Sequence, residues 1–191
     1  MLAFLLALAA GAHAEPPTSA PSAPTSSPAC EYNKDILELG FEKFDQEING
    51  GWRPLSYAGC EEKAAQVIRI YRSRLQFAIP LLYWHEGQLR ANMGDYKAAI
   101  ALMEKSRSPD AEDYGGWNPY VDATISFLKN DRKGLVKAKA RLEQQMKPDD
   151  WPKEVEWPQN HTAVEGLLRC FGKPYKIAYG SPECSRKAVG T

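Results

Sequence analysis

The sequence lacks several features that mark common classes of protein. It contains no run of about 20 apolar residues, the length that a helix needs to cross a bilayer. Its 24 basic and 24 acidic residues balance, so it has no excess of positive charge for a nucleic-acid partner. Neither a Gly-x-Ser-x-Gly segment nor a phosphate-binding glycine loop occurs. These absences argue against a membrane span, a nucleic-acid partner and the commonest nucleophile and nucleotide sites.

Metal-ligand patterns are missing too. The sequence has no Cys-x-x-Cys spacing, and its three histidines, His13, His85 and His161, are scattered. His85 and Glu86 are adjacent, so on a helix they point about 100 degrees apart and are poorly placed to share one ligand. No second histidine follows His85 at the four-residue spacing of zinc proteases. We therefore expect no metal or other cofactor, and interpret His85 as a hydrogen-bonded helix-packing residue.

The N-terminal segment predicts export. Residues 1–14 are apolar and end in Ala-His-Ala, a small-x-small cleavage pattern, which favours a signal peptide over a buried N-terminal helix. Residues 15–29 are rich in proline, serine and alanine and predict a disordered linker that favours extended conformations. The folded domain is then expected over residues 30–191, and a bacterial periplasm is the favoured compartment.

The four cysteines agree with export. An even number in an exported chain predicts two disulfides, and four cysteines allow three pairings. We favour Cys30–Cys60 and Cys170–Cys184, because these are neighbours in the sequence. On the chain-entropy model each bridge would contribute roughly 3 to 4 kcal/mol. The alternative of four free thiols requires that the chain is not exported.

Apolar residues at helical spacing predict an all-α fold. Residues 82–106 have the pattern of a helix, a tight turn at Gly94-Asp95 and a second helix. Pro80 fits the first turn of that helix, where its missing N–H costs nothing. Further helices are expected over residues 33–48, 60–75, 117–128, 132–146 and 161–171. Residues 172–191 are expected to be a turn-rich tail held by Cys170–Cys184.

An internal repeat relates the helix pairs. Sliding residues 82–106 forward by 36 positions aligns Trp84 with Tyr120 and Glu86 with Asp122. Sliding them back by 34 positions lays the Lys-Ala-Ala segment 97–99 on the identical segment 63–65. A period in this range is a mark of stacked helix pairs, which bury their apolar faces against one another.

The segment 83–106 resembles the tetratricopeptide repeats (TPR). The matching positions are Gly87, Gly94, Tyr96, Ala99 and Ser106. The segment departs from that motif at Glu86, where a leucine is usual, and at Arg90, where an aromatic residue is usual; Pro109 comes early for the closing proline. The resemblance covers about residues 60–145. It implies a stack of about three antiparallel helix hairpins, a TPR-like α-solenoid, here followed by a short C-terminal helix and a disulfide-tied tail.

The resemblance also implies a binding groove along the first helices of the pairs. Its candidate residues are Trp84, Gln88, Asn92, Trp117 and Tyr120. Gln88 and Asn92 lie one and two turns beyond Trp84, where they could hydrogen-bond a ligand backbone. The alternative is that Trp84 and Tyr120 belong to the core between repeats.

The sequence therefore predicts an exported, non-catalytic, TPR-like module that binds a protein or peptide. One version is an immunity protein that neutralises a toxin in the periplasm; another is an accessory or assembly factor of the cell envelope. A less favoured alternative is a hydrolase that uses the carboxylates of Glu86 and Asp122, which share one repeat position. We favour the simpler interpretation that each carboxylate pairs with a nearby basic residue, such as Arg90 one turn after Glu86.

Overall fold

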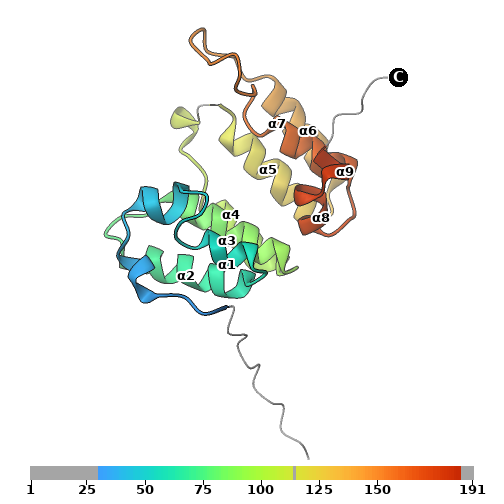
Figure 1. Cartoon of the computed structure of the whole chain (residues 1–191). Helices are drawn as coiled ribbons and strands as arrows, with labels where there is room; N and C mark the ends of the chain where they lie inside the picture. The colour runs from blue at the N-terminus through green and yellow to red at the C-terminus, as the bar shows by residue number, and fades with distance from the viewer. Residues whose placement is uncertain (1–29, 114, 186–191) are drawn as a thin grey trace, which may run out of the picture.

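The structure is a computed structural model that describes residues 30–113 and 115–185, and no strand occurs within these ranges (Figure 1). In chain order the elements are the 3-10 helix η2 (Lys34–Glu38), the π-helical η3 (Glu42–Gln46), α1 (Arg53–Tyr57), α2 (Glu61–Arg74), α3 (Pro80–Asn92), α4 (Tyr96–Glu104), the 3-10 helix η4 (Asp110–Glu112), α5 (Trp117–Leu128), α6 (Arg132–Glu143), α7 (His161–Arg169), α8 (Tyr175–Gly180) and α9 (Pro182–Ser185). The predicted signal peptide, residues 1–14, and the predicted linker, residues 15–29, lie outside the described residues.

The prediction of one continuous helix over residues 33–48 is wrong. Two short helical turns, η2 and η3, replace it, and Leu39 after η2 has extended backbone. The Tyr71 hydroxyl of α2 donates a 2.9 Å hydrogen bond to the Leu39 carbonyl oxygen. This bond satisfies a carbonyl group that a continuous helix would have paired with a backbone N–H. The Tyr71 ring also stacks on Phe44 of η3, with ring centroids 3.6 Å apart. A contact with a distant residue therefore holds the chain at the break.

The helix pair predicted over residues 82–106 is confirmed. Pro80 lies in the first turn of α3, and Gly94 adopts a left-handed φ of +82° in the turn that follows the helix. The Asp95 carboxylate caps α4 by accepting a 3.1 Å hydrogen bond from the Ala98 N–H. A Cβ on Gly87 would lie only 3.0 Å from Met103 Cγ, so glycine allows the close packing of α3 on α4.

The next pair repeats this construction. The helix predicted over residues 117–128 is α5, and the Asp131 carboxylate caps α6 by accepting a 2.9 Å hydrogen bond from the Gly134 N–H. The helix predicted over residues 132–146 ends earlier, at Glu143, and the one predicted over residues 161–171 ends at Arg169. Successive helices pack side by side, α2 on α3, α3 on α4, and α5 on α6.

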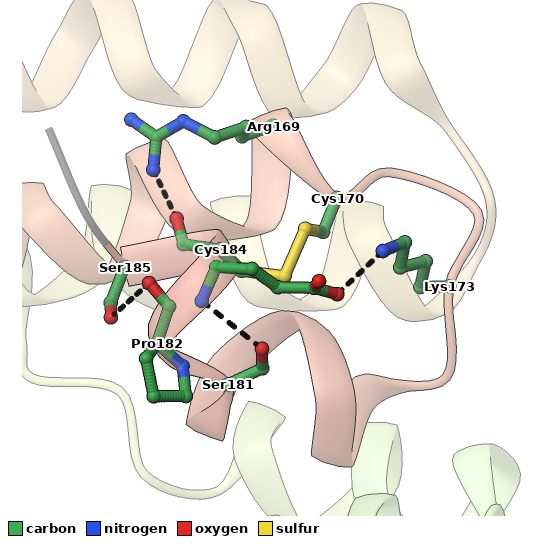
Figure 2. Close-up of a disulfide and its surroundings, with 8 residues drawn as sticks. Arg169, Cys170, Lys173, Ser181, Pro182, Cys184 and Ser185 are labelled. Carbon is green, nitrogen blue, oxygen red and sulfur yellow. Dashed lines mark hydrogen bonds and ion pairs between the residues drawn. A yellow bond between two sulfur atoms is a disulfide. The ribbon is translucent and has the colours of Figure 1, made fainter. Parts of the chain in front are cut away.

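Both predicted disulfides are confirmed. Cys30 is joined to Cys60 at the start of α2, with Cα atoms 5.5 Å apart. Cys170, which follows α7, is joined to Cys184 of α9, with Cα atoms 5.7 Å apart (Figure 2). Each bridge therefore ties one end of the described chain to a helix of the fold.

The C-terminal segment has more structure than a turn-rich tail. It forms α8 and α9, which pack on each other and on α7. The Ser181 hydroxyl between them accepts a 3.2 Å hydrogen bond from the Glu183 N–H, and Lys173 Nζ lies 2.6 Å from the Glu183 carboxylate (Figure 2). The disulfide and these polar contacts together fix α8 in place.

Among the described residues the apolar interior forms two clusters, and α3 contributes to both. Leu82 and Leu89 belong to the N-terminal cluster, which is built mainly from η2, η3, α1 and α2. Trp84 and Ala91, on the same helix, belong to the C-terminal cluster with α4 to α9. Helix α3 therefore joins the two halves of the molecule.

Candidate binding cleft

The aromatic residues predicted to line a groove form an internal cluster. Trp84 of α3 packs against Trp117 and Tyr120 of α5, with ring centroids 5.0 and 4.7 Å away. Trp84 and Tyr120 are buried, and the partly buried Trp117 donates from Nε1 to the Ser106 carbonyl oxygen at 2.6 Å. The structure thus places Trp84 and Tyr120 in the core between helix pairs, the alternative to an exposed groove.

Helix α8 covers the surface that the predicted groove would expose. Its Tyr175 is fully buried, and the Gln88 amide of α3 donates a 3.3 Å hydrogen bond to the Tyr175 hydroxyl. The Tyr120 hydroxyl donates to the Tyr179 hydroxyl at 3.2 Å. Burial raises the pKa of both Tyr120 and Tyr175 well above the usual value, so both phenols stay neutral. At Gln88 and Tyr120 the place of a ligand is therefore taken by the chain's own C-terminal segment.

An open cleft of about 490 Å³ lies beside α8. It is bounded by the turn that joins α1 to α2 and by the exposed side of α8. Three large side chains in its lining are exposed: Tyr57 at 66%, Ile177 at 41% and Tyr179 at 38%. Asn92, at the end of α3, is the one predicted groove residue that lines this cleft. Apolar lining with a few polar groups is typical of binding clefts.

The charged groups in the cleft lining compensate each other. Lys176 Nζ of α8 binds the Glu61 carboxylate of α2 at 2.5 Å. The hydrogen bond from Lys176 lowers the pKa of the Glu61 carboxyl below its usual value. Ser56, Ser181 and Asn92 supply uncharged polar groups. The lining therefore suits a ligand segment that has apolar anchors and little charge of its own.

Glu86 is held in an ion pair, although not with the residue expected. Arg72 Nη2 of α2 lies 2.8 Å from the Glu86 carboxylate, and its guanidinium stacks 3.9 Å above the Tyr83 ring. The expected partner, Arg90, instead binds Glu62 at 2.8 Å. Arg72 comes from the facing helix α2 and reaches the buried Glu86 carboxylate, whereas Arg90, whose side chain is exposed to a similar extent (18% against 17% for Arg72), binds the exposed Glu62 of α2.

Asp122, at the same repeat position, is also bound by arginines. Arg107 Nη2 and Arg141 Nη2 lie 2.6 and 2.5 Å from its two carboxylate oxygens. Burial alone would raise the pKa of the Asp122 carboxyl, but hydrogen bonds from Arg107 and Arg141 and their charges lower it below its usual value. Acid–base work by two carboxylates requires one to keep its proton near neutral pH, and paired arginines favour the ionised form.

His85 contacts an acidic residue that the sequence did not single out. Its Nδ1 lies 2.8 Å from Oδ1 of the fully buried Asp45 in η3, and Trp52 Nε1 donates to the same oxygen at 3.0 Å. Burial raises the pKa of the Asp45 carboxyl, but hydrogen bonds from His85 and Trp52 and the charges of His85 and Arg53 outweigh this and lower it. The contact joins η3 to α3 and agrees with a packing role for His85.

One group of potential metal ligands occurs within the described ranges. It consists of Cys170, Glu183 and Cys184. The two sulfur atoms are joined in a disulfide, so neither can act as a thiolate ligand (Figure 2).

The sequence reasoning missed the cleft residues Tyr57, Ile177 and Tyr179. A helical signal was present in the tail, because Tyr175 and Tyr179 are four residues apart and so share one helix face. The surrounding glycines and prolines favoured turns and obscured it. Tyr57 lies in a connection for which periodicity makes no prediction.

In comparisons with protein-family models, curated proteins and solved structures, no match to the chain was found. Within the described ranges, no helix has the length and apolar character needed to cross a membrane.

Proposed function

We propose that the chain is an exported, non-catalytic binding module, and that a protein or peptide partner docks in the cleft between the α1–α2 turn and α8. The observation that carries this proposal is the exposure of Tyr57, Ile177 and Tyr179 around one concave surface. Tyrosine is enriched among the residues that dominate binding energy, and its large ring loses little conformational entropy on binding.

We also propose that the helix pairs are a divergent TPR-like array. Support comes from the repeat itself: α3 and α5 are related by 36 residues, and each carries a carboxylate bound by an arginine from outside its own helix. Gly87 stands at the close approach of α3 and α4, and the small residue that aligns with it, Ala123, is buried in α5. The departure from a standard array is that α8 covers the groove side.

Export to an oxidising compartment, such as a bacterial periplasm, is the third part of the proposal. The two disulfides support it, because such bonds persist mainly outside the reducing cytosol. The segment 1–14 supports it through its signal-peptide pattern.

Affinity capture with matched variants tests the binding proposal. The cleft variant carries Tyr57→Ser and Ile177→Ser; the control carries Val136→Ser and Met146→Ser, which are also exposed (45% and 91%) and do not line the cleft. Because all four side chains are exposed, each variant should keep its stability to within about 1 kcal/mol. The intact protein and the control should recover the same partner from the host's envelope fraction, and the cleft variant should lose it at least tenfold.

The identity of the recovered partner also separates the versions of this function. A single toxin-like protein indicates an immunity protein, and components of envelope machinery indicate an accessory factor. Equal recovery by the cleft variant and the control would refute the assignment of the cleft.

A further inference from the structure

The chain that precedes Cys30 joins the fold beside the cleft. Cys30 is bonded to Cys60, and their Cα atoms are 5.5 Å apart. The two neighbours of Cys60, Gly59 and Glu61, both line the cleft. The disulfide therefore fixes the start of the described chain next to the surface that carries Tyr57.

The residues before Cys30 have a composition that matches the cleft lining. Residues 16–29 contain five prolines and no charged side chain. Proline-rich segments favour the polyproline II conformation, which loses little entropy on binding and docks in grooves lined by aromatic rings. The cleft offers Tyr57 and Tyr179 as aromatic walls, and its only charges, Glu61 and Lys176, already pair with each other.

We propose that residues 16–29 bind in this cleft as an extended, proline-rich peptide, so that the chain carries its own occupant for the site. The inference rests on the proposed function in one respect, namely that a partner must compete with this segment for the cleft. At about 3.1 Å per residue, the segment reaches on the order of 40 Å from Cys30, more than enough to lie across a neighbouring cleft.

The tether makes even weak binding effective. Because the segment is attached directly to Cys30, its binding is intramolecular, and a tethered ligand that can reach its site meets it at a local concentration on the order of millimolar. A segment with a dissociation constant of about 0.1 mM would then occupy the cleft about nine-tenths of the time and weaken partner binding about tenfold. The favoured ligand of the cleft would be an uncharged, proline-containing extended peptide of the same kind.

Photo-crosslinking of the purified, full exported chain tests this proposal. Benzoylphenylalanine replaces Ile177 in the cleft or, as the matched control, Val136 on α6, which is exposed to a similar extent (41% and 45%). After illumination, reduction and proteolysis, mass spectrometry should find residue 177 joined to the segment 16–29 of the same chain. The yield from position 136 should be at least about fivefold lower.

A second variant tests the role of proline. Serine replaces all five prolines of the segment, namely Pro16, Pro17, Pro21, Pro24 and Pro28. These positions lie outside the described fold, so circular dichroism should not change, while the crosslink from position 177 should fall about fivefold. An unchanged yield would contradict recognition of a polyproline conformation.

Three results would overturn the inference. They are no crosslink to the segment, equal yields from positions 177 and 136, and crosslinks between isotopically light and heavy chains in a mixed sample, which would show that a second copy supplies the occupant. The experiment uses the protein alone. It can therefore succeed when partner capture fails, or fail when partner capture succeeds.

Discussion

Removal of the Glu86 carboxylate should lower the free energy of unfolding by about 3 kcal/mol. The carboxylate is 4% exposed and its partner Arg72 is 17% exposed. Without Glu86, the Arg72 guanidinium would stay largely buried beside Tyr83 with no anion, a change that costs about 3–5 kcal/mol in other proteins. We expect the lower end of that range, because Arg72 keeps its stacking on the ring and some contact with water.

The ion pairs of Asp122, which aligns with Glu86 at a spacing of 36 residues, provide an internal control. Asp122 is 26% exposed, and its partners Arg107 and Arg141 are 31% and 47% exposed. Water screens such pairs, and each contributes about 0.2–1 kcal/mol. The Asp122→Ala variant should therefore lose only about 1 kcal/mol, although it removes two ion pairs where Glu86→Ala removes one.

Urea unfolding at neutral pH, followed by circular dichroism, measures both losses. A third variant replaces the Glu86–Arg72 pair by Glu86→Leu with Arg72→Met, which fills the site with apolar atoms and leaves no charge. It should recover most of the loss and lie within about 1 kcal/mol of the unmodified protein. The reasoning is wrong if Asp122→Ala costs as much as Glu86→Ala, or if the double variant is no more stable than Glu86→Ala alone.

Three further predictions concern the disulfide, the aromatic core and pH. Replacing both Cys170 and Cys184 by serine opens a loop with a sequence separation of 14 and should cost about 3 kcal/mol in non-reducing urea titrations. Trp84→Ala should cost about 3–5 kcal/mol because Trp84 is buried, whereas the exposed Tyr57→Ser should cost about 0.5 kcal/mol or less in the same assay. The folded state lowers the pKa of Asp45 from its ordinary value of 3.8, so its ionised form stabilises the fold above that pH and the benefit is lost as pH falls through the lowered value. Titrations from pH 7 to pH 3 should therefore show the gap between the unmodified protein and Asp45→Asn closing below about pH 4.

The features that could be predicted from the sequence depend on nearby residues. Pro80 and Gly94 mark the start of α3 and the turn after it, and Asp95 and Asp131 cap the helices that follow. Apolar spacing then fixes which side of each helix is buried. The disulfide pairing could be predicted because each bridge joins two cysteines that are neighbours in the sequence, at separations of 30 and 14.

The features that could not be predicted depend on contacts between distant residues. The helix expected over residues 33–48 is interrupted because Tyr71 binds the Leu39 carbonyl oxygen from α2. Arg72 reaches Glu86 from a facing helix, whereas a search along α3 leads to Arg90. Of the five residues predicted to line a groove, Asn92 alone lines the open cleft. The others could not be excluded from the sequence, because a repeat pattern does not show that a later segment covers the groove.

The position of the cleft follows from the way the series of packed helix pairs ends. The last pair, α5 and α6, exposes an apolar face that a terminal element must cover. Helix α7 packs on both, and α8 then continues across α3, where Tyr175 is buried. The segment that covers the last helix pair thereby occupies the surface predicted to be a groove, and its exposed residues Ile177 and Tyr179 line the cleft. Because a change at Trp84 disrupts the core, whereas Tyr57→Ser and Ile177→Ser change exposed side chains, the cleft variant can test the proposed partner binding without a loss of folding.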